Sequence, residues 1–491
     1  MSDLTGIRGF NFRLLAKIAG GLLVVEAGAL LLPVAIAAAW GEASLVGLLM
    51  SFALMIGVGV LLHNVVGRGA NYKVRERDGF WITSAVWVIV PLAGSLPYIA
   101  THTLDILNAI FESFSGFSTT GSTVIPHPET LDRSMLLWRA LTQWMGGMGL
   151  VLLIIAFTTN MGEGSSVLYV AEFSGTVQRR LHPHMARSVR RMWWVYVGET
   201  ALLVLILQAI EGNWIEALCL GFSTVSTGGF MTSAGGLSHL STFSQDVVAF
   251  FMLVSGVNLA LVYNLVTLGW KRLRGSNEVL VYLVIFAVAV VFTGLALMSV
   301  GNGAGESFHY AVFHIASTIS TSGFFIAPPH HWTFVAVAIT FPLIFVGACT
   351  GSTGGGIKVK RVMMVVRYIK NYFTRMVHPR AVFNVKVDGI VISDAYINKI
   401  FAFVFMYIAF VLGGAFVLML SGVDISASLA MSAANMANLG PTPITGELGV
   451  ALDYAILSPI AKTTLMVLMV AGRIEIFALV AIFSKSYWRR G

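Results

Sequence analysis

The chain has 491 residues, of which 57% are hydrophobic and only 11% are charged. This composition excludes a soluble globular domain, in which about 25% of residues are charged. A net charge of +8 is typical of a nucleic-acid-binding protein, so the distribution of the basic residues decides whether such a partner is needed. The sequence predicts an all-α integral membrane protein.

Ten apolar segments are long enough to cross a hydrocarbon core of about 30 Å as helices. They cover residues 12–39, 44–65, 79–100, 134–157, 191–210, 244–269, 279–300, 332–372 with an interruption, 396–420 and 456–484. An even number of spans places both termini on the same side. The two cysteines, Cys219 and Cys349, lie at membrane depth in this topology, so no disulfide framework is expected.

The basic residues gather on one side of the predicted membrane. If the N-terminus is cytoplasmic, 27 of the 31 Lys and Arg residues fall in cytoplasmic segments. The exceptions are Arg133, Arg139, Lys462 and Arg473. This positive-inside bias predicts that both termini are cytoplasmic. It also explains the net charge without a nucleic-acid partner, because basic flanks contact membrane lipid.

A short polar run ending in glycine occurs four times. The copies are Phe117–Gly121, Val225–Gly229, Ile319–Gly323 and Met436–Gly440. An apolar segment too short to cross the membrane precedes each copy, and spanning segments flank it. Non-helical backbone at membrane depth is tolerated where it is buried in protein or lines a water-filled cavity. We therefore expect four pseudo-symmetric repeats of helix, pore helix, filter loop and helix around one pore, after two extra transmembrane helices.

The repeats divide the chain into five units. We expect an N-terminal helix pair at 1–70, then pore repeats at 71–175, 176–275, 276–385 and 386–491. A residue that can cap a helix N-terminus stands sixteen positions before each final glycine. These residues are Asp105, Asn213, Ser307 and Asp424. The short helices therefore start in register, and their negative C-terminal dipoles point at the loops.

The loops suit a dehydrated cation, because a ring of backbone carbonyls can replace its water shell. Glycine permits the dihedral angles that such a loop needs. The alternative is ordinary close helix packing through small residues. The predicted ion-binding residues are Thr119, Thr120, Gly121, Thr227, Gly228, Gly229, Thr321, Ser322, Gly323, Asn438, Leu439 and Gly440. The fourth loop, with Ala437-Asn438, departs from the Ser-Thr pattern of the others.

The eighth span is interrupted by five glycines between residues 347 and 356. Each glycine costs a helix interior about 1 kcal/mol relative to alanine, so this run is expected to be a loop within the membrane. A phosphate-binding P-loop is excluded because Ile357 separates Gly356 from Lys358. A purely structural kink is the remaining alternative.

Arg473 lies near the middle of the last predicted span, where an ionisable residue is by default a functional candidate. We expect it to face a cavity or a partner. The alternative is a structural ion pair with Glu112, Glu199 or Glu475.

Together with the four loops, three segments resemble a known family over nearly the whole chain. These are Gln143–Gly149, Gly351–Lys358 and Gly472–Phe477. The chain resembles the TrkH-type subunits of the Trk/Ktr/HKT potassium transporter superfamily. The resemblance implies a filter glycine in each repeat, and Gly121 at the first position favours potassium over the sodium preference associated with serine there.

The resemblance also implies a gate formed by the glycine run and the arginine. Its residues are Gly347, Gly351, Ser352, Thr353, Gly354, Gly355, Gly356 and Arg473. It implies a location in the cell inner membrane, a homodimer, and a TrkA-type cytosolic regulatory subunit that binds nucleotide. The segment from Lys358 to Lys399 is where such a regulator could act. No cofactor is expected in this chain, with potassium as the substrate.

The predicted function is selective potassium uptake, and the protein is expected not to be an enzyme. The alternative is a sodium- or proton-coupled cation symporter with lower potassium selectivity. Symporters of inverted-repeat design bind substrate at broken helices, whereas four repeats of one direction are predicted here. An intramembrane enzyme is disfavoured, because the sequence contains no His-Glu-x-x-His motif.

Overall fold

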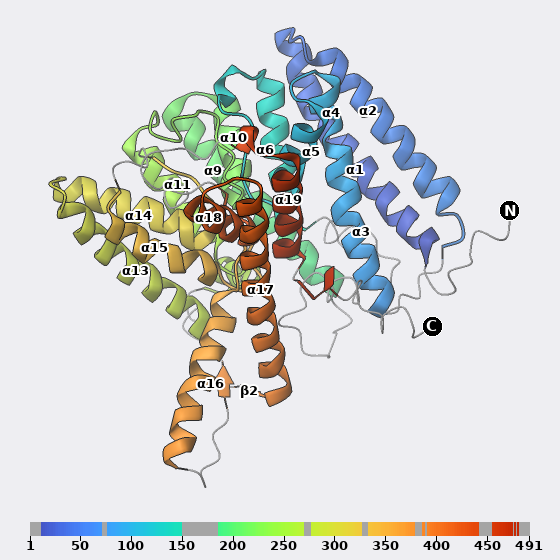
Figure 1. The fold of residues 1–491 in the computed structure, drawn as a ribbon. Coiled ribbons are helices and arrows are strands. Elements are labelled where there is room, and N and C mark those ends of the chain that lie inside the picture. The colour runs from blue at the N-terminus through green and yellow to red at the C-terminus, as the bar shows by residue number, and fades with distance from the viewer. Residues whose placement is uncertain are drawn as a thin grey trace.

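The fold is that of a computed structural model and is mostly helical (Figure 1). It describes residues 11–70, 76–149, 185–269, 276–326, 332–378, 385–387, 390–440, 454–474, 476–477 and 479–480. The longer helices are α1 (Phe12–Trp40), α2 (Leu45–Val60), α3 (Glu76–Gly94), α6 (Arg133–Gly147), α9 (Met185–Glu211), α11 (Thr242–Ser255), α12 (Leu259–Leu268), α13 (Asn277–Met298), α15 (Phe334–Val346), α16 (Val359–Val377), α17 (Asp394–Leu420) and α19 (Pro459–Arg473).

The remaining elements are short. Four helices stand where the short apolar segments were predicted, namely α5 (Ile106–Phe117), α10 (Trp214–Val225), α14 (Ala304–Ser320) and α18 (Ile425–Met436). Smaller helical turns are α4 (Leu96–Ala100), the π-helix Leu61–Val66 and the 3₁₀ turns Pro128–Thr130 and Tyr454–Ile456. Strands β1 (Val385–Val387) and β2 (Ile390–Ile392) pair antiparallel, with Val385 opposite Ile392. The hairpin was not predicted.

The prediction of a multi-pass membrane protein is supported by helix length and composition. Among the described residues, six helices are long and apolar enough to cross a membrane, and a seventh span results if α11 and α12 are counted together. The predicted spans 134–157 and 456–484 lie partly outside the described residues. Large apolar side chains on α13, such as Leu280, Val284 and Phe292, are exposed, as expected for a surface that faces lipid.

The prediction of one continuous span at 244–269 is wrong. Helices α11 and α12 meet at an angle of 104° across a break at residues 256–258. By contrast, the predicted interruption of the eighth span is present, because α15 ends at Val346 and α16 begins at Val359. In Figure 1, α16 and the adjoining part of α17 project below the rest of the molecule.

Three of the four predicted helix caps are confirmed. The side chains of Asp105, Asn213 and Asp424 accept hydrogen bonds from backbone N–H groups in the first turns of α5, α10 and α18. Hydrogen bonds from the hydroxyl and backbone N–H of Ser426 hold the pKa of Asp424 below its usual value. The Asp424 carboxylate is therefore negatively charged at neutral pH, and this charge interacts favourably with the positive, N-terminal end of the α18 dipole.

The fourth predicted cap is wrong. Helix α14 begins at Ala304 after the N-cap Gly303, so Ser307 lies inside the helix and is buried. Because Gly303 has an extended backbone and a residue with no side chain is tolerated at an N-cap, the helix can start four residues earlier than the aligned pattern indicates.

The largest buried cluster joins the N-terminal helices to the helices around the polar loops. It includes Leu14 of α1, Trp87 of α3, Phe117 of α5, Trp138 of α6 and Leu468 of α19. The first helices are thus part of the core and brace one side of the loop region.

Candidate functional site: a ring of glycine loops

The four glycine loops share one backbone conformation. We define loops 1 to 4 as residues 117–121, 225–229, 319–323 and 436–440. In each loop the final glycine has a positive φ, and so does the residue two positions before it. The φ values are 57° at Thr119, 55° at Thr227, 62° at Thr321 and 53° at Asn438, and they lie between 70° and 82° at the glycines.

Each short helix ends in the same hydrogen-bonded cap, a Schellman motif. In loop 1, the N–H of Thr120 donates to the carbonyl of Ser115, and that of Thr119 donates to Gly116, both at 2.9 Å. The equivalent six-residue bonds in the other loops are Gly228 to Ser223, Ser322 to Ser317 and Leu439 to Ala434, at 2.8 to 2.9 Å. The divergent fourth loop therefore has the same backbone despite its different side chains.

Three of the left-handed positions carry threonine. A β-branched residue with positive φ is a true outlier, whereas asparagine tolerates this region more readily. Such strain costs on the order of 1–3 kcal/mol per residue and persists only where the surroundings impose it. The loops are thus held by their neighbours in a conformation that these side chains do not prefer.

The loops contact one another in a fixed order. A Cβ added at Gly440 would overlap the carbonyl oxygen of Thr120 in loop 1, and one at Gly121 would overlap that of Gly228 in loop 2. A Cβ at Gly229 would overlap the carbonyl oxygen of Ser322 in loop 3. Glycine is required at these positions for two reasons, the positive φ and the close approach of the next loop.

The glycine run after α15 connects loops 3 and 4. A Cβ at Gly354 would lie 2.6 Å from the carbonyl oxygen of Ser320, and one at Gly355 would overlap that of Ala437. The N–H of Gly355 also donates to the Thr321 hydroxyl at 2.7 Å. The predicted gate residues are therefore packed directly against the predicted ion-binding loops.

Side-chain amides hold the loops, one from α6 and one from loop 4 itself. The Gln143 amide donates to the carbonyl of Gly228 at 2.7 Å and accepts from the N–H of Phe230 at 3.1 Å. The Asn438 amide donates to the Thr120 hydroxyl at 3.1 Å and to the carbonyl of Met469 at 2.9 Å. Asn438 thus bridges loop 4 to loop 1 and to α19.

A buried ion pair that was not predicted from the sequence braces loops 1 and 2. Arg139 Nε lies 2.9 Å from Glu112 Oε1, and both side chains are at most 2% exposed. Glu112 also accepts from the N–H of Val124, just after loop 1, and Arg139 donates to the carbonyl of Met231, just after loop 2. The sequence signal was present, since Arg139 is one of the four basic residues outside the cytoplasmic segments.

Arg473 makes a different set of contacts from the ion pairs considered above. Its guanidinium donates to the carbonyls of Thr353, Gly146 and Gly147 at 2.7 to 2.8 Å. Glu112 instead pairs with Arg139. Glu199 accepts from the Ser255 hydroxyl, and Glu475 lies outside the described residues.

A small cavity of about 70 Å³ lies beside Arg473 and the glycine run. Its lining includes Gly147, Gly354, Lys358, Asn438 and Arg473. The lining joins the predicted gate to loop 4 and places two guanidinium groups, those of Arg361 and Arg473, and the ammonium group of Lys358 around the cavity. A cation passing here would experience positive charge, which raises its energy.

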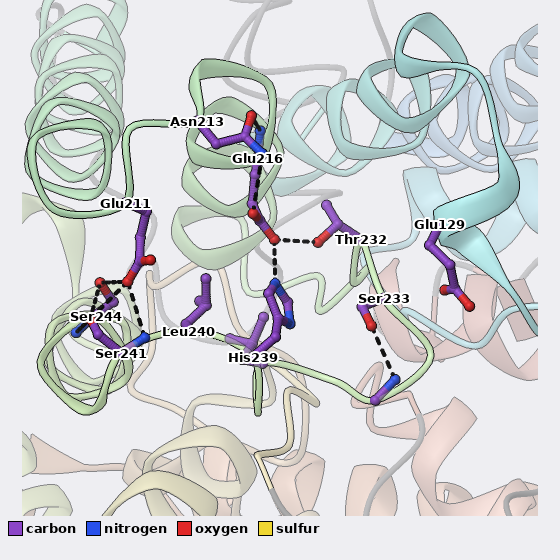
Figure 2. Close-up of polar contacts among 12 residues, drawn as sticks. Glu129, Glu211, Asn213, Glu216, Thr232, Ser233, His239, Leu240, Ser241 and Ser244 are labelled. Carbon is purple, nitrogen blue, oxygen red and sulfur yellow. Dashed lines mark hydrogen bonds and ion pairs between the residues drawn. The ribbon is translucent and has the colours of Figure 1, made fainter.

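Two partly buried carboxylates hold the segment that follows loop 2 (Figure 2). Glu216 of α10 accepts from the Thr232 hydroxyl at 2.9 Å and contacts His239 at 2.6 Å. Glu211 accepts from the backbone N–H and hydroxyl of Ser241, which caps α11. These contacts fix the segment that connects loop 2 to the next helix.

The fold and this ring define an all-α, multi-pass membrane protein whose polar backbone loops meet at its centre. The sequence profile of the TrkH family, described as "Cation transport protein", matches residues 49–490. The chain belongs to the TrkH family, which is a family of transporters and not of enzymes, and the resemblance inferred from the motifs is confirmed.

Similar proteins cover the full length of this chain. It is 30% identical over 490 residues to the Trk system potassium uptake protein TrkH of Halomonas elongata, covering 98% of this chain and 100% of that protein. It is 28% identical over 487 residues to the protein of the same description in Escherichia coli, with the same coverage. The crystal structure of the potassium transporter TrkH from Vibrio parahaemolyticus matches with a TM-score of 0.89 at 26% identity, covering 97% of this chain and 100% of that one.

Substitution of Gly229 tests the packing of the ring. Gly229→Ala is expected to abolish ion uptake, because the new Cβ would overlap the Ser322 carbonyl in addition to the strain of positive φ. The matched control is Gly212→Ala, where φ is 73° but open space surrounds the Cβ position. Uptake of ⁸⁶Rb⁺ by cells that express each variant at equal level measures the difference. Equal uptake by both variants would show that the loops are not closely packed.

Removal of one partner of the buried ion pair should destabilise the protein. Arg139→Met leaves the Glu112 carboxylate buried without its cation, which costs about 3–5 kcal/mol, so the melting temperature in detergent should fall clearly. Arg133→Ala, at the exposed start of the same helix, is the control and should change stability by only about 0.5 kcal/mol. The double variant Arg139→Met/Glu112→Gln should lose less than the sum of the two single losses. Additive losses would argue against a coupled pair.

Proposed function

We propose that this chain takes up potassium ions through the ring of glycine loops. The observation that carries the proposal is the shared loop backbone, in which a left-handed residue and a left-handed glycine recur in four loops that pack against one another. A loop of this kind can present carbonyl oxygens to a dehydrated cation. The similar proteins named above are described as potassium uptake proteins or potassium transporters.

In this proposal the filter consists of the residues predicted from the sequence. The carbonyl oxygens would replace the water shell, while the hydroxyls of loops 1 and 3 support the backbone, as in the 2.7 Å contact between Ser118 and Thr120 and the 2.8 Å contact between Ser320 and Ser322. Uptake needs no covalent chemistry. A membrane potential contributes about 2.3 kcal/mol per charge per 100 mV, which favours inward movement of a cation.

We further propose that the glycine run and Arg473 form the gate. Residues 347–356 contact loops 3 and 4 directly, so they cannot move without changing the support of the ring. Arg473 joins this run to the end of α6 through three carbonyls. A movement that breaks these bonds would displace the positive charge and open the path.

The wider arrangement completes the proposal. The units 1–70, 71–175, 176–275, 276–385 and 386–491 would be the N-terminal helix pair and the four pore repeats. The protein would lie in the inner membrane with both termini on the cytoplasmic side. It would work as a homodimer together with a TrkA-type nucleotide-binding regulator. The projecting region formed by α16, the hairpin and the beginning of α17 (Figure 1) supports a cytoplasmic contact surface.

Ion flux into liposomes tests the transport proposal. Liposomes that contain the purified protein and are loaded with potassium should accumulate ⁸⁶Rb⁺, driven by the outward potassium gradient. External potassium or unlabelled rubidium should reduce this uptake, whereas sodium and lithium should not. Gly229→Ala protein provides the inactive control. Equal competition by all four ions would contradict a potassium filter. A requirement for sodium or a proton gradient would support a symporter.

Arginine substitution tests the gate. Arg473→Gln removes the positive charge and should raise basal flux about tenfold, which corresponds to about 1.4 kcal/mol in the barrier. Arg473→Lys retains the positive charge but lacks the planar guanidinium that donates to three carbonyls. This variant therefore distinguishes the effect of the charge on flux from the effect of the hydrogen bonds. Unchanged flux in both folded variants would argue against the gating role.

A further inference from the structure

Two broken helices interlock beneath the ring. The first break, at residues 256–258, separates α11 from α12 in repeat 2. The second break is the glycine run between α15 and α16 in repeat 3. A break within the membrane leaves backbone donors and acceptors that need partners in the protein.

The two breaks satisfy each other's backbone groups. The N–H of Cys349 donates to the carbonyl of Gly256 at 2.9 Å, and the N–H of Leu259 donates to that of Gly351 at 3.2 Å. The Asn258 amide donates to the carbonyl of Thr350 at 2.6 Å. A Cβ at Gly351 would lie 2.6 Å from that amide nitrogen, so the Asn258 side chain packs closely against the backbone of Gly351.

A carboxylate completes the hold on the glycine run. Glu278, in the first turn of α13, is 5% exposed, and its Oε1 accepts from the N–H of Thr350 at 2.6 Å. Both backbone polar groups of Thr350 are therefore held by side chains, the carbonyl by Asn258 and the N–H by Glu278. Asn258 caps α12 and Glu278 lies in the first turn of α13, so a shift of either helix end pulls on the run.

We propose that Asn258 and Glu278 are positioning residues that lock the glycine run in the place seen here. This inference rests on the gating role given to the run under the proposed function. The lock extends control of the gate to α12 and the start of α13. Both adjoin residues 270–276, whose three basic residues are among those that the positive-inside bias assigns to the cytoplasm. Repeat 2 would then take part in gating through its broken helix.

Two substitutions release the lock selectively. Asn258 also caps α12, since its Oδ1 accepts from the N–H of Ala260 at 2.8 Å. Asn258→Ser keeps a capping oxygen but removes the amide that reaches Thr350. Glu278→Ala removes the other bond, whereas Glu278→Gln keeps an acceptor oxygen and should behave as the parent protein. The matched control is Asn213→Ser, which makes the same change from asparagine to serine at the N-cap of α10, away from the two breaks.

The readout that does not depend on transport is the buried thiol of Cys349, within the run. All variants are made in a Cys219→Ala background, so that Cys349 is the thiol labelled by maleimide. Labelling should be about tenfold faster in Asn258→Ser and Glu278→Ala than in the parent, Glu278→Gln or Asn213→Ser proteins. Loss of one buried hydrogen bond to a charged or strong acceptor changes an opening equilibrium by about that factor. Unchanged labelling in folded variants would overturn the proposal.

Basal ⁸⁶Rb⁺ flux into liposomes, measured on the same preparations, should rise with the labelling while the preference for potassium over sodium stays constant. Faster labelling with unchanged flux would support the lock and overturn the gating role of the run. A change in ion preference would show that the substitutions disturb the ring instead and would overturn selective locking.

Discussion

Within a hydrocarbon layer, the protein itself must provide a partner for each backbone polar group, and this requirement shapes the centre of the molecule. The short helices cannot cross, so each ends in a Schellman motif that satisfies its last carbonyls. Where α11 and α15 stop, the two breaks bond to each other. Arg473 provides donors for three further carbonyls. The irregular backbone is therefore a connected network, and its parts depend on one another.

Close packing and strain act together in this network. Glycine allows one loop to approach the next, while the threonines at left-handed positions are held by their surroundings. The buried pair of Glu112 and Arg139 carries a desolvation cost, and its value is in orientation, because its hydrogen bonds reach the ends of loops 1 and 2. Such a site is defined by fixed distances between segments far apart in sequence.

Much of this arrangement could be predicted from sequence, because hydropathy, basic residues and repeated glycines report on local and membrane-scale constraints. Those patterns located the short helices, three of four caps and the interruption before α16. They did not reveal the bend at residues 256–258, since Gly256 and Asn258 alone do not stop a helix in an otherwise apolar segment, and the bend depends on bonds to a distant break. The partner of Arg139 could not be predicted either, because spacing along the chain does not show which carboxylate faces a guanidinium in three dimensions. The filter and gate assignments remain predictions.

The divergence of loop 4 has a consequence for symmetry. Because all four loops belong to one polypeptide, no rotation relates them, and Asn438 bridges to loop 1 where Thr119, Thr227 and Thr321 occupy the corresponding positions. Four identical subunits would repeat any substitution around the axis. Here each quarter can change alone, so the four loops share one backbone conformation but have unequal side-chain surroundings.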